Sequence, residues 1–252
     1  MKTIVIIGST GTIGSALASY FKNENCIEAS RSLKTKENKV HLDLSDFRSV
    51  CDFIKRISIE KIDILFLNSG VFEEKKYTQD GYEYNFMVNA FSPYYIAKRV
   101  LELQPDCRIV LTSSISILHA KQELNPKNWK RIYRNTKLIE HGLLKNLEGL
   151  YPNSIFYAHP GIVPSRLSFG LHAVPTRRFI QLFGNTLEAG ANCLIYASSL
   201  PSCKNTWVVP RGIFNLRGRP KVKKIKRSVL LKDEIKKTII KMEKELEEKY
   251  GI

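Results

Sequence analysis

A phenol and an ammonium that could exchange a proton stand one helical turn apart at Tyr133-x-x-x-Lys137. Residues four apart share one face of a helix. An ammonium beside a phenol favours the phenolate and lowers the tyrosine pKa toward neutrality, which suits general acid/base catalysis. The spacing alone is weak evidence, because the chain has 11 tyrosines and is rich in lysine, and Tyr94 with Lys98 also has it.

Two serine hydroxyls follow a predicted strand upstream of this pair. Ser113 and Ser114 come directly after the largely apolar run 108–112. Open α/β sheets bind ligands at the carboxyl ends of their strands, so Ser114 stands where a ligand is expected; the alternative is a strand-end cap. Tyr94 and Lys98 precede this strand, in a helix expected to pack against the sheet, and are the poorer candidates.

A glycine-rich turn joins the first predicted strand, 3–7, to a helix predicted over 12–23. Glycines allow a tight turn, close approach of the backbone to a phosphate, and close packing of helix on strand. The helix N-terminus offers unpaired N–H groups and a positive dipole end to a pyrophosphate. A tight turn without a ligand is the alternative, but the flanking elements supply the required context. The predicted phosphate turn consists of Gly8, Ser9, Thr10, Gly11, Thr12, Ile13 and Gly14.

Ser30 and Arg31 stand at the end of the second predicted strand, 27–30. An acidic residue here would accept hydrogen bonds from the adenosine ribose, whereas an arginine can pair with a 2′-phosphate. The nearest acidic residue, Glu28, lies inside the strand rather than at its end. The sequence therefore favours NADP(H) over NAD(H), with a surface arginine in a polar loop as the alternative.

Strands and helices alternate along most of the chain, which predicts an α/β fold with a doubly wound parallel sheet. The 252 residues suit one domain, which we place at 1–210, followed by a basic extension over 211–252. The remaining predicted strands are 40–44, 62–68, 108–112 and 155–158. The remaining predicted helices are 45–57 with Ser45 as N-cap, 81–103 bent near Pro93, 129–150, and 185–198 opened by an Asn185–Glu188 capping box.

Positive charge is concentrated at the C-terminal end. The formal net charge is +16, and residues 201–252 hold 15 Lys and Arg against six Asp and Glu. Such a segment could attract nucleic acid, anionic lipid or an acidic substrate. No helix-turn-helix, zinc or aromatic stacking motif accompanies it, so a solvated basic face is the favoured interpretation and nucleic acid is not an expected partner.

The cysteines and the N-terminus indicate the compartment. Five widely spaced cysteines without a C-x-x-C pattern predict neither a disulfide framework nor a metal site. No signal-peptide pattern precedes the first strand, and no apolar run could span a bilayer. A cytoplasmic protein is therefore expected.

The extension ends in an amphipathic pattern over 232–250. One interpretation is reversible docking of its apolar stripe on an anionic membrane. The favoured interpretation is that the stripe packs on the domain or on a partner subunit, because glutamates among the lysines dilute attraction to anionic lipid. The stripe consists of Ile235, Ile239, Met242, Leu246 and Tyr250.

Over roughly residues 1–200, the order of these motifs resembles the short-chain dehydrogenase/reductase family, which implies a Rossmann fold. The matching positions are the glycine turn, Asp43, Asn68-Ser69-Gly70, Asn89, Ser114, Tyr133 with Lys137, and Pro160-Gly161. The runs 42–45, 78–83, 88–89, 108–114 and 159–163 are similar to the retinol-dehydrogenase-like branch. The chain departs from the family pattern at Thr12 (middle glycine), Ser69 (alanine) and Ser165 (threonine).

The resemblance implies four catalytic residues. Tyr133 would give or take the proton at the substrate oxygen, and Ser114 would hydrogen-bond that oxygen. Lys137 would bind the nicotinamide ribose and lower the tyrosine pKa, and Asn89 would hold a water linked to Lys137. The cofactor would contact Asp43 at its adenine, and Asn68 and Gly70 at its adenosine ribose. Tyr133 and Lys137 would also contact the cofactor. The further binding residues are Leu44, Ser69, Pro160, Gly161 and Val163.

The implied activity is hydride transfer between NADP(H) and a small carbonyl or alcohol compound. The resemblance also implies a homodimer or homotetramer, formed by the helices at 81–103 and 129–150. Apolar residues in the loop 160–185 predict a partly hydrophobic substrate; they are Leu167, Phe169, Leu171, Val174 and Phe179. A non-catalytic nucleotide-binding sensor on the same fold remains the alternative.

Overall fold

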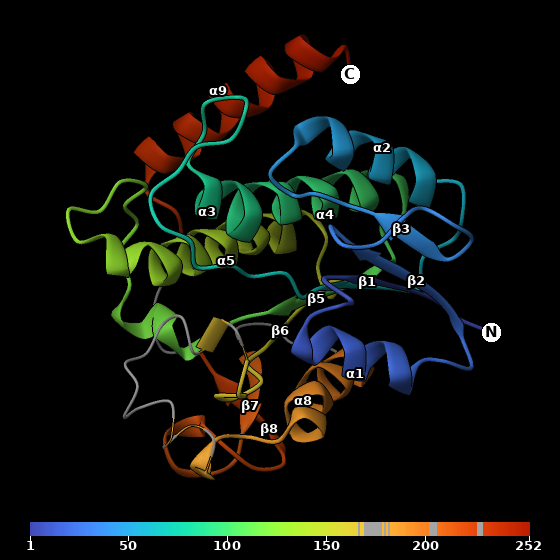
Figure 1. The fold of residues 1–252 in the computed structure, drawn as a ribbon, viewed down its shortest axis with the longest axis vertical. Coiled ribbons are helices and arrows are strands. Elements are labelled where there is room, and N and C mark those ends of the chain that lie inside the picture. Colours follow the sequence, from blue (N-terminus) through green and yellow to red (C-terminus); the bar gives the residue numbers. More distant parts are fainter. Residues whose placement is uncertain (166, 169–177, 179, 181, 202–205, 226–228) are drawn as a thin grey trace.

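An eight-stranded sheet with the order β3-β2-β1-β4-β5-β6-β7-β8 forms the centre of the protein, shown as a computed structural model (Figure 1). The structure describes residues 1–252 except 166, 169–177, 179, 181, 202–205 and 226–228. Strands β1 to β7 pair in parallel and β8 is antiparallel. The predicted doubly wound parallel sheet is confirmed. The strands are β1 (Thr3–Ile7), β2 (Asn25–Ser30), β3 (Lys39–His41), β4 (Ile64–Leu67), β5 (Arg108–Thr112), β6 (Ile155–Ala158), β7 (Thr206–Pro210) and β8 (Pro220–Lys224).

Helices cover both faces of this sheet. Helices α1 (Thr12–Tyr20) and α8 (Leu187–Ser199) lie together on one face, and α2 (Phe47–Ile57), α4 (Ser92–Leu103) and α5 (Ile132–Leu150) lie on the other (Figure 1). All four residues of β4 are buried, as are Ile4–Ile7 of β1. These continuous apolar runs form central strands because both of their faces pack against helices.

Two helices begin one or two residues later than predicted, because a different side chain caps each N-terminus. At α2 the carboxylate of Asp46 accepts a hydrogen bond from the Arg48 N–H (3.0 Å), so Asp46 rather than Ser45 is the N-cap. At α8 the hydroxyl of Thr186 accepts from the Ala189 N–H (3.2 Å). The predicted cap Asn185 instead donates to the Pro160 carbonyl (2.7 Å).

The helix predicted over 81–103 is three consecutive segments: α3 (Tyr84–Phe86), a π segment (Met87–Phe91) and α4. It begins late because the Glu83 carboxylate accepts the N–H groups of Asn85 and Phe86. The irregularity lies in the π segment and not at Pro93, which occupies the first turn of α4 without disturbing it. A π turn is a wider turn that often occurs at functional sites, and this one contains Asn89.

The helix predicted over 129–150 begins as a 3₁₀ turn, Trp129–Arg131, and becomes α5 at Ile132. The Asn128 side chain caps the turn by accepting a hydrogen bond from the Lys130 N–H (3.1 Å). Tyr133 therefore lies in the first turn of α5.

The basic extension adds both a strand and a helix to the domain. The sequence analysis predicted neither β7 nor β8, and β8 forms the edge of the sheet with exposed lysines at 223 and 224. Charged residues, lysine above all, on an edge strand oppose pairing with another chain. The helix α9 (Asp233–Tyr250) follows.

Helix α9 packs on the outer side of α4 and α5 (Figure 1). Four residues of its apolar stripe are at most 5 % exposed: Ile235, Ile239, Met242 and Leu246. Lys98 of α4 forms an ion pair with Glu243 (2.7 Å). A Cβ on Gly142 of α5 would lie 2.6 Å from the Val229 carbonyl oxygen, so α5 also fits closely against the segment leading into α9.

This packing has two consequences for the sequence predictions. The amphipathic stripe is buried on the domain, as the favoured interpretation had it. The chain's own C-terminal helix covers the outer side of α4, which is part of one of the two helices predicted to bind a second subunit. In the part of the chain that the structure describes, no helix is both long and apolar enough to cross a membrane.

Candidate active site

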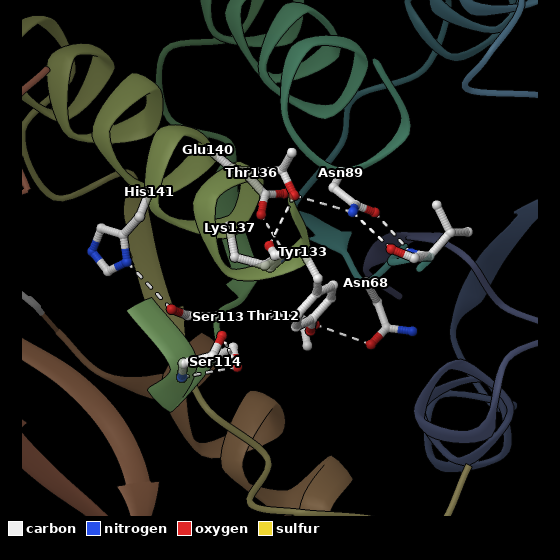
Figure 2. Close-up of polar contacts among 12 residues, drawn as sticks. Asn68, Asn89, Thr112, Ser113, Ser114, Tyr133, Thr136, Lys137, Glu140 and His141 are labelled. Carbon is white, nitrogen blue, oxygen red and sulfur yellow. Dashed lines mark hydrogen bonds and ion pairs between the residues drawn. The ribbon is translucent and has the colours of Figure 1, made fainter. Parts of the chain in front are cut away.

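Tyr133 and Ser114 meet where α5 begins beside the carboxyl end of β5 (Figure 2). Ser114 follows β5 and caps a 3₁₀ turn, Ile115–His119; its hydroxyl oxygen accepts from the backbone N–H (3.2 Å) and hydroxyl (2.9 Å) of Ser116. Ser114 also forms a hydrogen bond with the Tyr133 hydroxyl. The fold therefore brings together the two groups predicted to contact the substrate oxygen.

Asn89 connects the loop after β4 to α5. Its amide oxygen accepts from the Val71 N–H (2.7 Å), and its amide nitrogen donates to the Val71 carbonyl (2.8 Å) and to the Thr136 hydroxyl (3.2 Å). Thr136 lies between Tyr133 and Lys137 on α5. Asn89 therefore fixes the helix that carries the predicted catalytic pair; its predicted water-holding role stays a prediction.

Lys137 is buried beside a carboxylate that the sequence analysis did not single out. Lys137 and Glu140 form an ion pair, and their side chains are 2 % and 0 % exposed (Figure 2). Residues 133, 137, 140 and 144 recur at intervals of four, three and four, so they share one face of α5. That period was visible in the sequence and could have identified Glu140 as a neighbour of the catalytic lysine.

The expected lowering of the tyrosine pKa is not found. Burial raises the pKa of Tyr133 to about 12, the Glu140 carboxylate adds to the rise, and the hydrogen bond with Ser114 opposes it. The prediction considered only the ammonium of Lys137, whereas Glu140 neutralises that charge at close range. Burial also raises the pKa of Glu140, to about 7, although Lys137 acts in the opposite direction.

A buried histidine, His141, contacts Ser113 at the end of β5. His141 Nδ1 lies 3.3 Å from the Ser113 hydroxyl, and its ring stacks on Tyr157 of β6 with a centroid distance of 4.1 Å. Burial lowers the pKa of His141 to about 3, and Lys137 and Lys145 lower it further. The imidazole is therefore neutral at physiological pH and acts as a packing and hydrogen-bonding group.

A cleft of about 190 Å³ opens at the carboxyl ends of β1, β2 and β4. A Cβ on Gly14 would lie 2.1 Å from the Gly8 carbonyl oxygen, and Gly8 has φ +80°, so both positions need glycine. The Ser9 hydroxyl is buried without a hydrogen-bond partner in the described part of the chain. These features fit a backbone cradle for a dinucleotide. The predicted cofactor residues that line this cleft are Gly8, Gly11, Ser30, Arg31, Asp43, Leu44, Asn68, Ser69 and Gly70.

Comparisons with known proteins agree with this geometry. No protein-family model matches the chain. A curated protein of Streptomyces sp. (strain C5), named "Putative daunorubicin C-13 ketoreductase DnrU", is 25% identical over 228 residues, which are 80% of this chain and 79% of that protein. The solved short-chain dehydrogenase family protein from Francisella tularensis superposes with a TM-score of 0.59 at 18% identity, over 80% of this chain and 93% of the other. The structure of BdcA in complex with NADPH superposes with a TM-score of 0.58 at 19% identity, over 78% of this chain and 86% of the other.

The chain resembles the short-chain dehydrogenase/reductase family. The resemblance rests on the ordered motifs, the fold and the sequence relative together. None of these findings tests the retinol-dehydrogenase-like branch, which stays a prediction.

The cleft has a basic end at β2. Arg31 Nη1 donates to the Tyr84 hydroxyl (2.6 Å), and the Lys76 ammonium lies 3.7 Å from the centre of the Tyr84 ring. The Ser30 hydroxyl accepts from Thr10 in the glycine turn (3.0 Å). Tyr84 was not predicted as a site residue; it places the Arg31 guanidinium at the end of the cleft where a 2′-phosphate was expected.

The loop after β6 forms the other end of the candidate site. Gly161 has φ +83°, and a Cβ there would lie 2.3 Å from the Leu216 carbonyl oxygen. The Asn185 side chain ties this loop to the extension, because it donates to the Pro160 carbonyl and accepts from the Gly218 N–H (3.2 Å). Val163 and Thr12 line a second cavity of about 300 Å³ beside it.

Four of the apolar residues in the loop 160–185, which were predicted to favour a hydrophobic substrate, lie outside the described residues: Phe169, Leu171, Val174 and Phe179. Leu167 is described, and its Cδ2 atom lies 3.6 Å from where a Cβ of Gly70 would be. Leu167 of this loop therefore lies close to the turn after β4. Within the described ranges, no group of three or more His, Cys, Asp or Glu side chains is arranged to hold a metal ion.

Proposed function

We propose that this protein is an NADP(H)-dependent oxidoreductase that transfers a hydride between the nicotinamide and a carbonyl or alcohol substrate, with Tyr133 as general acid/base. The observation that carries the proposal is the pairing of Tyr133 with Ser114 at the carboxyl end of β5, beside the cleft. A ligand is expected at this edge of an open α/β sheet.

Tyr133 and Ser114 would have different roles at the same substrate oxygen. The bound cofactor supplies the hydride chemistry. Tyr133 donates a proton to the substrate oxygen during reduction, and the Ser114 hydroxyl hydrogen-bonds the same oxygen as negative charge develops on it. Because the Tyr133 pKa is about 12, the phenol is protonated at neutral pH and ready to act as the acid.

Two observations support NADP(H) as the cofactor. Arg31, held by Tyr84, offers charge-assisted hydrogen bonds at the end of β2, whose last two residues, Ala29 and Ser30, carry no carboxylate to receive ribose hydroxyls. The BdcA structure, which shares the fold, was solved with NADPH. Gly8, Gly11 and Gly14 would hold the pyrophosphate, and Lys137 the nicotinamide ribose.

A ketone with a hydrophobic body is the favoured substrate class. The sequence relative carries the name "Putative daunorubicin C-13 ketoreductase DnrU", and the apolar side chain of Leu167 lies against Gly70 at the edge of the cleft. Pockets for small molecules are typically lined by apolar side chains, with a few polar groups that orient the ligand.

The proposal is tested by following NADPH oxidation with a panel of ketones and aldehydes. We expect turnover of bulky apolar ketones with NADPH, and weaker activity with NADH. Arg31→Ala should weaken NADPH binding by about 10-fold or more and change NADH binding little, because a charge-assisted contact is worth about 1.5–3 kcal/mol. The matched control is Lys34→Ala, which removes a basic side chain from the following loop.

Two outcomes would contradict the proposal. Tight NADPH binding without turnover of any carbonyl compound would favour the nucleotide-sensor alternative. Equal losses for NADPH and NADH in Arg31→Ala would remove the 2′-phosphate argument.

A further inference from the structure

Glu140 is a buried carboxylate in the middle of the active-site helix, and the roles implied for the family's catalytic residues do not include it. Its side chain is 0 % exposed, and burying a charged carboxylate is costly unless a partner compensates it. The partner is Lys137, three residues earlier on α5 and itself 2 % exposed. In the described part of the chain, neither carboxylate oxygen has a further hydrogen-bond partner.

The neighbourhood of Glu140 contains few other charges. On α5, Tyr133 and His141 are the nearby titratable groups; the tyrosine lies two turns away on the same face, and the imidazole is neutral. Lys145, one turn beyond His141, is paired with Glu148 (2.7 Å). Lys137 is thus the cation that faces Glu140 from its own helix.

The charged groups on the elements packed against α5 are engaged elsewhere. On α4, Lys98 pairs with Glu243, Tyr95 donates to Glu247 (3.0 Å), and Arg99 pairs with Glu102. On α3, Tyr84 accepts from Arg31. On β6, Tyr157 donates to Glu148 (3.1 Å). On the flanking 3₁₀ turns, His119, Lys130 and Arg131 are exposed, and the π segment carries no titratable side chain.

We propose that Glu140 is a positioning residue of the active site: the buried counterion that fixes the charge and the place of the Lys137 ammonium beneath Tyr133. The inference rests on the proposed role of Tyr133. A lone buried ammonium tends to lose its proton, and the paired carboxylate prevents this. The same carboxylate also opposes the ammonium field at Tyr133, which adds to the effect of burial in keeping the phenol protonated.

The sign of the effect on Tyr133 follows from this arrangement. Glu140→Gln removes the negative charge and keeps the shape of the side chain. Deprotonating the Tyr133–Lys137 pair then becomes easier, since one fewer negative charge opposes it. We expect the tyrosinate of Tyr133 to form at a pH lower by about one unit.

The test uses the full chain without cofactor or substrate. Tyrosinate absorbance is followed against pH, and subtracting the curve of the matching Tyr133→Phe variant isolates Tyr133. The expected result is a midpoint near 12 in the parent and a midpoint about one unit lower in Glu140→Gln. In an active enzyme, the rise of alcohol oxidation with pH should move in the same direction.

Glu148→Gln is the matched control. It removes another carboxylate that pairs with a lysine three residues earlier on α5, but one that lies two turns farther from Tyr133. We expect the Tyr133 midpoint of this variant to stay at the parent value. An unchanged or raised midpoint in Glu140→Gln, or an equal shift in Glu148→Gln, would overturn the proposal.

A double variant covers the case in which Glu140→Gln does not fold. Removing one partner of a buried ion pair is more damaging than removing both. Adding Lys137→Met to Glu140→Gln should therefore restore a cooperative thermal transition, and a double variant that also fails to fold would overturn the counterion role. The titration needs no turnover. A parent protein without carbonyl-reducing activity would therefore contradict the proposed function but not the counterion role of Glu140.

Discussion

The two Tyr-x-x-x-Lys pairs of this chain have the same spacing and opposite surroundings. Tyr133 and Lys137 lie at the start of α5, beside Ser114 and the cleft. Tyr94 and Lys98 lie on α4 and face the C-terminal helix, where Lys98 pairs with Glu243. Burial raises the pKa of Tyr94, and the carboxylate of Glu243 raises it further.

The difference shows what the spacing does and does not determine. Four residues along a helix place a phenol and an ammonium on one face, and both pairs satisfy that condition. Only the α5 pair also lies at the carboxyl end of the parallel strands, with a serine hydroxyl directed at its phenol. The α4 pair uses its lysine to bind α9, so it contributes to the stability of the fold.

The largest expected difference between the two pairs is in turnover. Tyr133→Phe removes the transferable proton and should lower kcat by about 10²-fold or more while NADPH still binds. Tyr94→Phe should leave kcat within about two-fold of the parent, because the phenol is not near the reacting atoms. Steady-state kinetics and NADPH titration of both variants check this. The reverse pattern would mean that the α4 pair is the catalytic one.

The second difference concerns stability in acid. The pKa of His141 in the folded protein is about 3, below its ordinary value of 6.5, so the unfolded chain takes up the proton first as the pH falls. Stability should therefore decline between about pH 6.5 and pH 3, by up to about 1.4 kcal/mol per pH unit for this residue. His141→Phe should make the decline shallower.

Urea unfolding at several pH values measures this slope. His159, whose pKa burial lowers to about 4, leaves part of the decline in place. Lys98→Met should keep the full slope, because α4 and α9 carry no histidine. An equally steep decline in His141→Phe would show that the buried imidazole of α5 is not its source.

The smallest expected difference is in thermal stability. Lys98→Met leaves the partly buried Glu243 carboxylate without its cation, which should cost about 1–3 kcal/mol. For a chain of this size that corresponds to a fall in Tm of about 2–10 °C, with kcat unchanged. Differential scanning fluorimetry and a parallel activity assay check both halves. A loss of kcat without a fall in Tm would give α4 a catalytic role.

The sequence predicted the fold correctly where local hydrophobic patterns agree with the packing of the elements. The buried runs of β1, β4, β5 and β6 were readable because parallel strands covered on both faces are continuously apolar. The choice of Tyr133 over Tyr94 followed from its position after β5. Asn89, Ser114 and Lys137 were then placed by the order of the motifs, and the structure brings them onto neighbouring elements.

The parts that were missed depend on partners distant in sequence. β8 is rich in lysine and becomes a strand only because β7 pairs with it. The cap at Asn185 was wrong because its side chain holds Pro160 and Gly218 instead of its own helix. Glu140 was overlooked, and with it the sign of the Tyr133 pKa shift, because a glutamate in a helix is ordinarily read as a surface residue.

The contacts of α9 have a consequence for how the protein is made. Its side chains bind groups 145 to 170 positions earlier, through Lys98, Tyr82 and Asp80. A ribosome releases those partners long before it releases α9, so the outer side of α4 and α5 stays uncovered until α9 has emerged. We expect nascent chains stalled before residue 233 to recruit hydrophobic-binding chaperones, and chains that have released α9 to lose them as that helix docks. Crosslinking of stalled and released chains to a chaperone would measure that handover.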